Sequence, residues 1–251
     1  MEVWVGLVML MGALGVGVGL CRWWVLGMAS KGGGVEGRNI LLVTAHPDDE
    51  SMFFVPFSRD AIRQGKRISL LCLSKGLEPG QTRINELTLA AKMLGFDKSE
   101  VYGVGGCLGG IGPFQDGFTA DWRKEEIAEV VEHYSVLWDI DVILSFDKAG
   151  VSGHPNHLQT HQGVLHHKLH YPNSKASHYQ LHSTPIPLKY LSWVGILLEV
   201  TRREKSSIYL NENFHVVWQA MCLHSSQFVW FRRLYLLFST FVHLNILEQM
   251  N

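Results

Sequence analysis

The sequence predicts an α/β domain with a mostly parallel, Rossmann-like sheet and helices on both faces, preceded by an N-terminal transmembrane helix. The domain is predicted because short apolar runs alternate with helical segments and lead directly into polar loops. The membrane helix is predicted because Val3–Leu20 contains no charged residue. A chain of 251 residues has room for one large α/β domain and little more.

The N-terminal segment fits a membrane anchor better than a cleaved secretory signal. A span needs about 20 apolar residues, and Arg22 and Trp23 then follow in an order typical of the membrane–water interface. A secretory signal usually starts with positive charge, which this sequence lacks. Because the cationic flank prefers the cytosol, we expect the rest of the chain to face that side. The predicted division is 1–30 anchor, 31–38 linker and 39–251 catalytic domain.

The expected sheet and its helices follow from the period of the apolar residues. Buried strands are predicted at 40–45, 68–73, 101–104 and 141–146, and an edge strand at 207–210. Helices are predicted at 52–63, 82–94, 121–136, 154–168, 214–224 and 228–244. Pro56 is expected to interrupt the first helix, and Gly95 to end the second.

The first polar corner is His46-Pro47-Asp48-Asp49-Glu50, directly after the buried run Ile40–Ala45. Ligands of open α/β sheets bind beyond the carboxyl ends of the strands. A catalytic zinc site needs three protein ligands from His, Asp, Glu or Cys and one open position. His46 and Asp49 could be two of the three. The alternative is a plain strand-to-helix corner, in which Pro and acidic residues suit the first helical turn.

The second polar corner follows the run Asp141–Phe146 and ends in His154-Pro155-Asn156-His157. Because both corners follow parallel strands, they should share one sheet edge and bring a second histidine to His46 and Asp49. His157 and His161 are spaced i, i+4, which also suits a metal. We nevertheless expect the later histidines of this helix to be solvated, namely His161, His166, His167 and His170.

Two cationic positions have open interpretations. Arg83 lies off the apolar stripe of its helix, so it either faces solvent or points at an anionic or hydroxyl-rich ligand. Arg232-Arg233 lies among Trp230, Phe231 and Tyr235, which suits either core packing or an interfacial helix on a membrane. The formal net charge of −1 provides no basic surface that would indicate a nucleic-acid partner.

Four motifs resemble the zinc-dependent de-N-acetylases of the PIG-L/LmbE type. They are AHPDDE (Ala45–Glu50), TRINEL (Thr82–Leu87), GVSGHPNH (Gly150–His157) and CLHSSQ (Cys222–Gln227). The resemblance implies that His46, Asp49 and His157 bind Zn²⁺, that Asp48 is the general base, and that a protonated His154 stabilises the oxyanion. It also implies that Arg83 contacts the substrate. Asp147 is a further candidate, to orient one of the two histidine rings.

The resemblance further implies removal of acetyl from an N-acetylglucosaminyl lipid at the cytosolic face of the endoplasmic reticulum membrane, early in glycosylphosphatidylinositol-anchor synthesis. One departure stands out: Gly105-Gly106 lies where the family usually has an acidic residue that holds the sugar. Either Asp116 replaces that residue or sugar binding is weakened. Two alternatives therefore remain, the same chemistry on a soluble acetylated amino sugar, and a membrane-anchored scaffold with little or no catalysis.

Overall fold

The computed structural model describes residues 34–77, 79–104, 107–202, 206–211 and 213–250. The predicted anchor, residues 1–30, and the pair Gly105-Gly106 lie outside these ranges. Within them, no helix has both the length and the hydropathy that crossing a bilayer requires.

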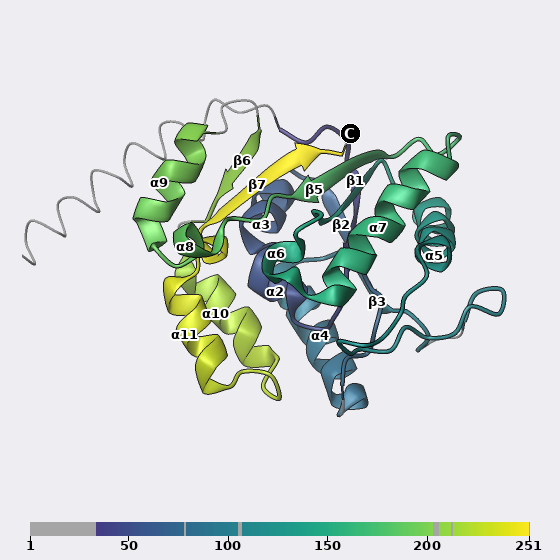
Figure 1. The fold of residues 1–251 in the computed structure, drawn as a ribbon, viewed down its shortest axis with the longest axis horizontal. Helices are drawn as coiled ribbons and strands as arrows, with labels where there is room; N and C mark the ends of the chain where they lie inside the picture. The colour runs from purple at the N-terminus through teal and green to yellow at the C-terminus, as the bar shows by residue number, and fades with distance from the viewer. Residues whose placement is uncertain (1–33, 78, 105–106, 203–205, 212, 251) are drawn as a thin grey trace, which may run out of the picture.

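The described part of the chain forms a seven-stranded sheet in the order β3-β2-β1-β4-β5-β7-β6 (Figure 1). The strands are β1 Asn39–Thr44, β2 Arg67–Cys72, β3 Lys98–Val101, β4 Val142–Phe146, β5 Ser177–Leu181, β6 Ser207–Leu210 and β7 Leu244–Gln249. The first five pair in parallel, whereas β7 runs antiparallel to both β5 and β6. The predicted mostly parallel sheet is confirmed, as is the edge position of Ser207–Leu210.

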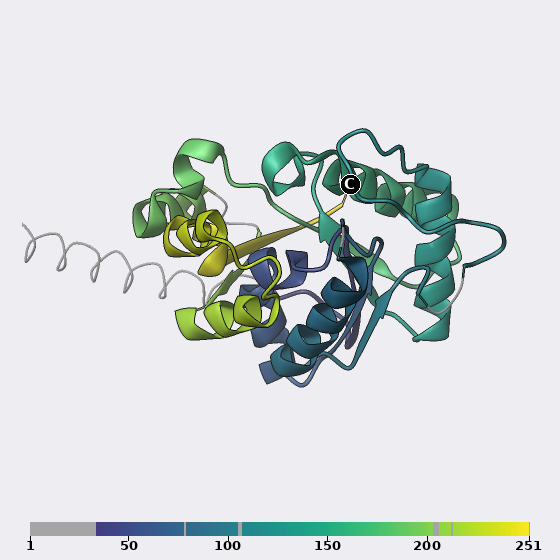
Figure 2. The same cartoon turned by 90° about the horizontal axis from the view of Figure 1, so that it is seen from below.

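Helices cover both faces of the sheet. They are α2 Asp49–Phe53, α3 Val55–Arg63, α4 Gly80–Leu94, α5 Lys124–Leu137, α6 Gly150–Gly153, α7 Pro155–His170, α8 Ile186–Lys189, α9 Ser192–Arg202, α10 Phe214–Leu223 and α11 Trp230–Phe238. Figures 1 and 2 place α5 and α7 on one face and α3, α4 and α10 on the other. In both views α8, α9 and α11 lie together at one end of the molecule.

The centre of the sheet positions the site. Every residue of β1 and of β4 is buried, as expected for parallel strands covered on both faces. Ile40 pairs with Val142, so the two strands lie side by side. The strand order reverses between them, and such a switch point is where open α/β sheets bind their ligands.

Several predicted boundaries differ from the structure. The helix predicted over 52–63 is two helices that meet at Phe54, with Pro56 in the first turn of α3. The helix predicted over 228–244 ends at Phe238, and Ser239 then caps a short 3₁₀ turn that leads into β7. That strand was missed because its buried Asn245 breaks the apolar pattern; the Asn245 side chain bonds to the backbone of Phe53 and Phe57.

Two of the histidines predicted to be solvated are buried. His161 bonds through Nδ1 to the carbonyl of Phe146, at 3.0 Å. His167 lies between His178 and Glu132, at 2.8 and 2.7 Å. Both rings point from α7 toward the sheet. The sequence of α7 is polar on several sides, so it did not indicate which of its histidines are buried.

Candidate metal and active site

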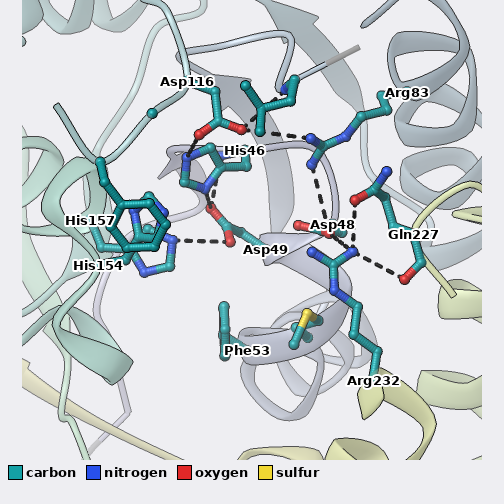
Figure 3. Close-up of a pocket in the computed structure, with 14 residues that line it drawn as sticks. His46, Asp48, Asp49, Phe53, Arg83, Asp116, His154, His157, Gln227 and Arg232 are labelled. Carbon is teal, nitrogen blue, oxygen red and sulfur yellow. Dashed lines mark hydrogen bonds and ion pairs between the residues drawn. The ribbon is translucent and has the colours of Figure 1, made fainter. Parts of the chain in front are cut away.

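The two polar corners meet in a pocket at the carboxyl ends of β1 and β4 (Figure 3). The cavity measures about 430 Å³. It is lined by His46, Asp48, Asp49, Met52, Phe53, Leu77, Arg83, Asp116, Gly117, Phe118, His154, His157, Gln227 and Arg232. Of the residues predicted from the sequence, all but Asp147 line this cavity.

The first corner is a tight, fully buried turn. The Asp49 carboxylate accepts the backbone N–H of Ala45 at 3.1 Å and of His46 at 2.8 Å, which folds the chain back on itself. Asp48 has a φ of 127°, a conformation that non-glycine residues rarely adopt. Such strain persists only where the surroundings impose it, and it clusters at functional sites. The plain-corner interpretation does not account for it.

Glu50 braces this corner from below. One of its oxygens accepts the N–H of Asp48 at 3.1 Å, and the other contacts His224 Nε2 at 2.6 Å. Both side chains of the Glu50–His224 pair are completely buried. Burial alone would lower the pKa of His224. The charge and the hydrogen bond of Glu50 outweigh that effect, so the pKa is raised above its ordinary value. The motif around His224 therefore supports the turn that carries Asp48 and Asp49.

The second corner is held by backbone contacts. His157 donates from Nδ1 to the carbonyl of Gly150 at 3.0 Å. Gly150 has a φ of +57°, and a Cβ there would come within 2.9 Å of the His157 Cβ, so this position requires glycine. We expected Asp147 to orient one of the two histidine rings, but it does not bond to either ring. It accepts the N–H groups of Ala149 and Gly150 at 3.0 Å and bonds to Ser183, and so shapes the loop that holds His157.

Three predicted metal ligands converge on one point. His157 Nε2 lies 3.2 Å from one Asp49 oxygen, and His46 Nδ1 lies 3.7 Å from the other. His157 donates from Nδ1, and His46 Nε2 faces the oxygens of Asn156 and Asp116, so each ring's other nitrogen carries the lone pair. With both rings neutral, two lone pairs and a carboxylate face one another, a set of donors that one divalent cation can bind. This donor set fits zinc.

His154 has a different role from its two neighbours. Its nitrogens lie close enough to those of His46 and His157 to form a three-histidine cluster. However, its Nδ1 accepts the N–H of Asn156 at 3.2 Å, which places the ring proton on Nε2. Burial, with His46 and His157 nearby, lowers the pKa of His154 to about 4. At pH 7 this favours a neutral ring, with its Nε2–H available as a hydrogen-bond donor, over the protonated ring of our prediction.

Asp48 is not among these ligands and contacts two arginines. Arg232 Nη1 lies 2.5 Å from the Asp48 carboxylate, and Arg83 Nη2 lies 3.7 Å from it. Burial raises the pKa of Asp48, and the Arg232 charge offsets only part of that rise. Gln227 Oε1 accepts from Arg232 at 3.0 Å and fixes its position. Sequence analysis missed Arg232 as a site residue, because both of its interpretations, core packing and a membrane-surface helix, placed it away from the pocket. The one sequence feature that could have indicated its role is a cation on an otherwise apolar helix.

Arg83 points into the pocket rather than to solvent. Its guanidinium donates to the Pro47 carbonyl at 2.9 Å and lies 3.7 Å from Asp116. Gly76 makes room for it, because a Cβ at that position would lie 2.1 Å from the guanidinium. Asp116 also contacts His46 Nε2 at 3.1 Å. An acidic residue thus lines the pocket even though 105–106 is Gly-Gly. This position is the one that Asp116 would need in order to replace the family's acidic residue.

Comparison with known proteins finds relatives that match most of the chain. The model of the GlcNAc-PI de-N-acetylase (PIG-L) family matches residues 41–168. A probable N-acetylglucosaminyl-phosphatidylinositol de-N-acetylase of Schizosaccharomyces pombe is 31% identical over 84% of this chain and 87% of its own. The Bos taurus enzyme of that name is 33% identical over 84% and 83%.

Solved structures share the fold. A teicoplanin-pathway deacetylase aligns with a TM-score of 0.57 at 13% identity, covering 86% of this chain and 99% of its own. The family match covers both polar corners, and the two relatives extend the similarity over most of the chain. The chain therefore belongs to the GlcNAc-PI de-N-acetylase family.

Proposed function

We propose that this protein hydrolyses the acetamide of N-acetylglucosaminyl-phosphatidylinositol to give the free amine and acetate, an early step of glycosylphosphatidylinositol-anchor synthesis. The observation that carries the proposal is the convergence of His46, Asp49 and His157 beside an unligated carboxylate, Asp48. The relatives that match most of the chain carry this activity in their names. A neighbouring solved structure is described as the zinc-inhibited form of teicoplanin deacetylase.

The metal we propose is Zn²⁺, held by His46, Asp49 and His157. A zinc ion held there would act as a Lewis acid, polarising the amide carbonyl and activating water near neutral pH. Asp48 lies next in sequence to a ligand but is free to take the proton of the attacking water and pass it to the leaving amine. Its raised pKa suits a group that must both accept and return a proton.

His154 and Arg83 complete the machinery. The neutral His154 ring can donate its Nε2–H to the oxygen that becomes negative in the transition state, as donors of an oxyanion hole do. Arg83, held between Pro47 and Asp116, presents a fixed cation to the sugar lipid. Asp116, which we propose as the acidic sugar contact in place of one at 105–106, lies on the opposite side of that guanidinium from Asp48.

We place the protein at the endoplasmic reticulum membrane, anchored once by residues 1–30, with the 39–251 domain in the cytosol. Its partners are then a glycolipid and a bilayer, and we propose no nucleic-acid partner. Relatives 28% identical over about half of the chain, such as one from Streptomyces griseus, are named 1D-myo-inositol 2-acetamido-2-deoxy-α-D-glucopyranoside deacetylase. Deacetylation of a soluble amino sugar therefore remains the second candidate.

The test combines metal analysis with deacetylation in membranes. We expect about one zinc per wild-type chain and release of acetate from lipid-linked N-acetylglucosamine. His157→Ala should lose both, whereas His170→Ala, an exposed histidine of the same helix, should lose neither. A His157→Ala protein that retains zinc and turnover would contradict the assignment. Turnover of only a water-soluble amino sugar would favour the second candidate.

A further inference from the structure

Helix α11 carries an unusual outward face. Trp230, Phe231, Leu234, Leu237 and Phe238 form one stripe along the helix and are 71, 55, 46, 54 and 53% exposed. The opposite side of the helix is packed, with Leu236 only 1% exposed. Contiguous apolar surface of this kind marks a protein or membrane contact.

The apolar surface continues onto the neighbouring helices. Tyr190, next to α8, packs against Tyr235 of α11 with ring centroids 6.4 Å apart. In α8 and α9, Ile186 is 70% exposed and Val194 50% exposed. We call the exposed apolar residues of α8, α9 and α11 the end face; Figures 1 and 2 show these three helices gathered at one end of the molecule.

On the three helices of the end face, the exposed charges are positive. The only acidic residue of its three helices, Glu199, is 2% exposed. Arg202 and Arg233 are exposed at its margins, the latter over the Phe228 ring at 5.0 Å. An apolar stripe with Trp, Phe and Leu and cations at its edge suits the headgroup region of a bilayer that contains anionic lipid.

The position of α11 links this surface to the pocket. The inner side of the same helix supplies Arg232, which contacts Asp48. The cavity lining also includes two exposed apolar side chains, Leu77 at 62% and Phe118 at 76%. A lipid whose sugar occupies the pocket would therefore meet apolar side chains at the pocket wall and along α11.

The chain also approaches the sheet at this end. The backbone N–H of Val35 bonds to the Tyr209 hydroxyl of β6 at 2.8 Å, and β6 is the edge strand beside α9 in Figure 1. The apolar run Val3–Leu20 precedes this point in sequence. An anchor made from that run would join the domain at the end that bears the end face.

We propose that the end face docks on the cytosolic surface of a lipid bilayer, with α11 lying in the headgroup region and presenting the pocket to membrane-borne substrate. The docking itself does not depend on the reaction assigned above. Only its kinetic consequence for a lipid substrate rests on the proposed function.

An environment-sensitive probe tests the docking directly. A nitrobenzoxadiazole label is placed at Leu237→Cys or Leu169→Cys in the full chain, with Cys21, Cys107 and Cys222 replaced by Ser. Leu169 is 63% exposed on α7, away from the end face. In phosphatidylcholine vesicles containing phosphatidylinositol, we expect the emission at position 237 to shift to shorter wavelength and rise severalfold, and that at 169 to stay unchanged.

Kinetics provide the second measurement. Replacing Trp230, Leu234 and Leu237 by Gln should raise the KM for lipid-linked substrate in vesicles roughly tenfold or more and leave turnover of its deacylated headgroup unchanged. The matched control replaces Val136, Leu137 and Leu169, also exposed, by Gln.

The two measurements separate the possible failures. No spectral shift at position 237, or equal shifts at 237 and 169, would overturn the docking. A shift at 237 that needs no vesicles and grows with protein concentration would also overturn it, in favour of a second copy of the chain. Absence of all deacetylation together with a shift confined to 237 would refute the reaction and leave the docking supported.

Discussion

Residues 39–170 and residues 171–250 contribute to the same pocket in different ways. The first region supplies the parallel strands β1 to β4 and both polar corners, and with them all of the proposed metal ligands. The second supplies β5, the antiparallel pair β6 and β7, the turn between α10 and α11 that carries His224 and Gln227, and helix α11 with Arg232. Reactive groups thus lie on the rigid sheet edge, while the later segment braces and covers them.

Among the many contacts between the regions, three bear directly on the polar corners. His224 is paired with Glu50 and Arg232 with Asp48, and the Ser183 hydroxyl donates to Asp147. Each joins a side chain of the later region to one in or beside a polar corner. The first region therefore determines what chemistry is possible, and the second determines how firmly its groups are held and what reaches them.

The largest expected effect tests whether the chemistry resides in the first region. Asp48→Asn keeps the shape of the corner but removes the base, so kcat should fall roughly 10²- to 10⁴-fold. Metal content should stay at the wild-type value because Asp48 is not a proposed ligand. Activity assays and metal analysis are run beside Asp121→Asn, an exposed carboxylate. Loss of the metal with the activity would make Asp48 a ligand rather than the base.

The next prediction tests whether the buried Glu50–His224 pair stabilises the first polar corner. His224→Gln leaves Glu50 buried without its cationic partner, and breaking a buried pair in this way costs about 3–5 kcal/mol. The free energy of unfolding, measured by denaturant titration in detergent, should fall by that amount. His215→Gln, exposed on α10, the helix that ends just before His224, is the matched control and should change little. Equal stability of the two variants would remove the proposed structural role of the Glu50–His224 pair.

Sequence reasoning succeeded where the signals are local. The buried run before His46 and the one before His154 each lead directly into a polar corner, and parallel strands bring such corners to one edge. That combination was sufficient to predict that a histidine of the second corner would lie beside His46 and Asp49, where the structure has His157. The choice of His157 over His154 came from the resemblance to the family.

Sequence reasoning failed where the burial or location of a side chain depends on partners that are distant in sequence. Arg232 and Asp48 are far apart in sequence, and no periodicity links them. The burial of His167 depends on Glu132 and His178, which come from α5 and β5. Asn245 is polar yet buried because β7 brings it to the backbone of Phe53 and Phe57. In each case a polar group is stabilised by a partner that the local pattern does not reveal.

A third prediction tests the later region's direct contribution to catalysis. Arg232→Ala removes the guanidinium that holds the Asp48 carboxylate, so kcat on a soluble headgroup substrate should fall roughly 10- to 100-fold through misplacement of the base. Arg233→Ala, the exposed neighbour, should retain wild-type turnover of that substrate. Equal activity of the two variants would restrict the later region to a covering role.

The smallest expected effect concerns a buried junction between the regions. His178 of β5 and His167 of α7 are bonded at 2.8 Å, and burial with the adjacent His167 lowers the pKa of His178 to about 4. In the unfolded chain a histidine titrates near 6.5, so between these values the unfolded state binds a proton that the folded state does not. This contribution to stability is complete above pH 6.5 and is lost as the pH falls toward 4.

Comparing wild type with His178→Gln isolates that contribution. The variant is less stable at pH 7.5, but its deficit should shrink by roughly 2 kcal/mol by pH 5, because only the wild type loses stability through this ring. Urea unfolding in detergent at both pH values measures the difference. A deficit that is independent of pH would mean that folding leaves the pKa of His178 unchanged, contrary to this prediction. A deficit that grows as the pH falls would mean that the folded protein already holds the ring protonated, with Glu132 across from His167 supplying the countercharge. The two regions would then be joined by a charged contact here, as they are at Glu50 and His224.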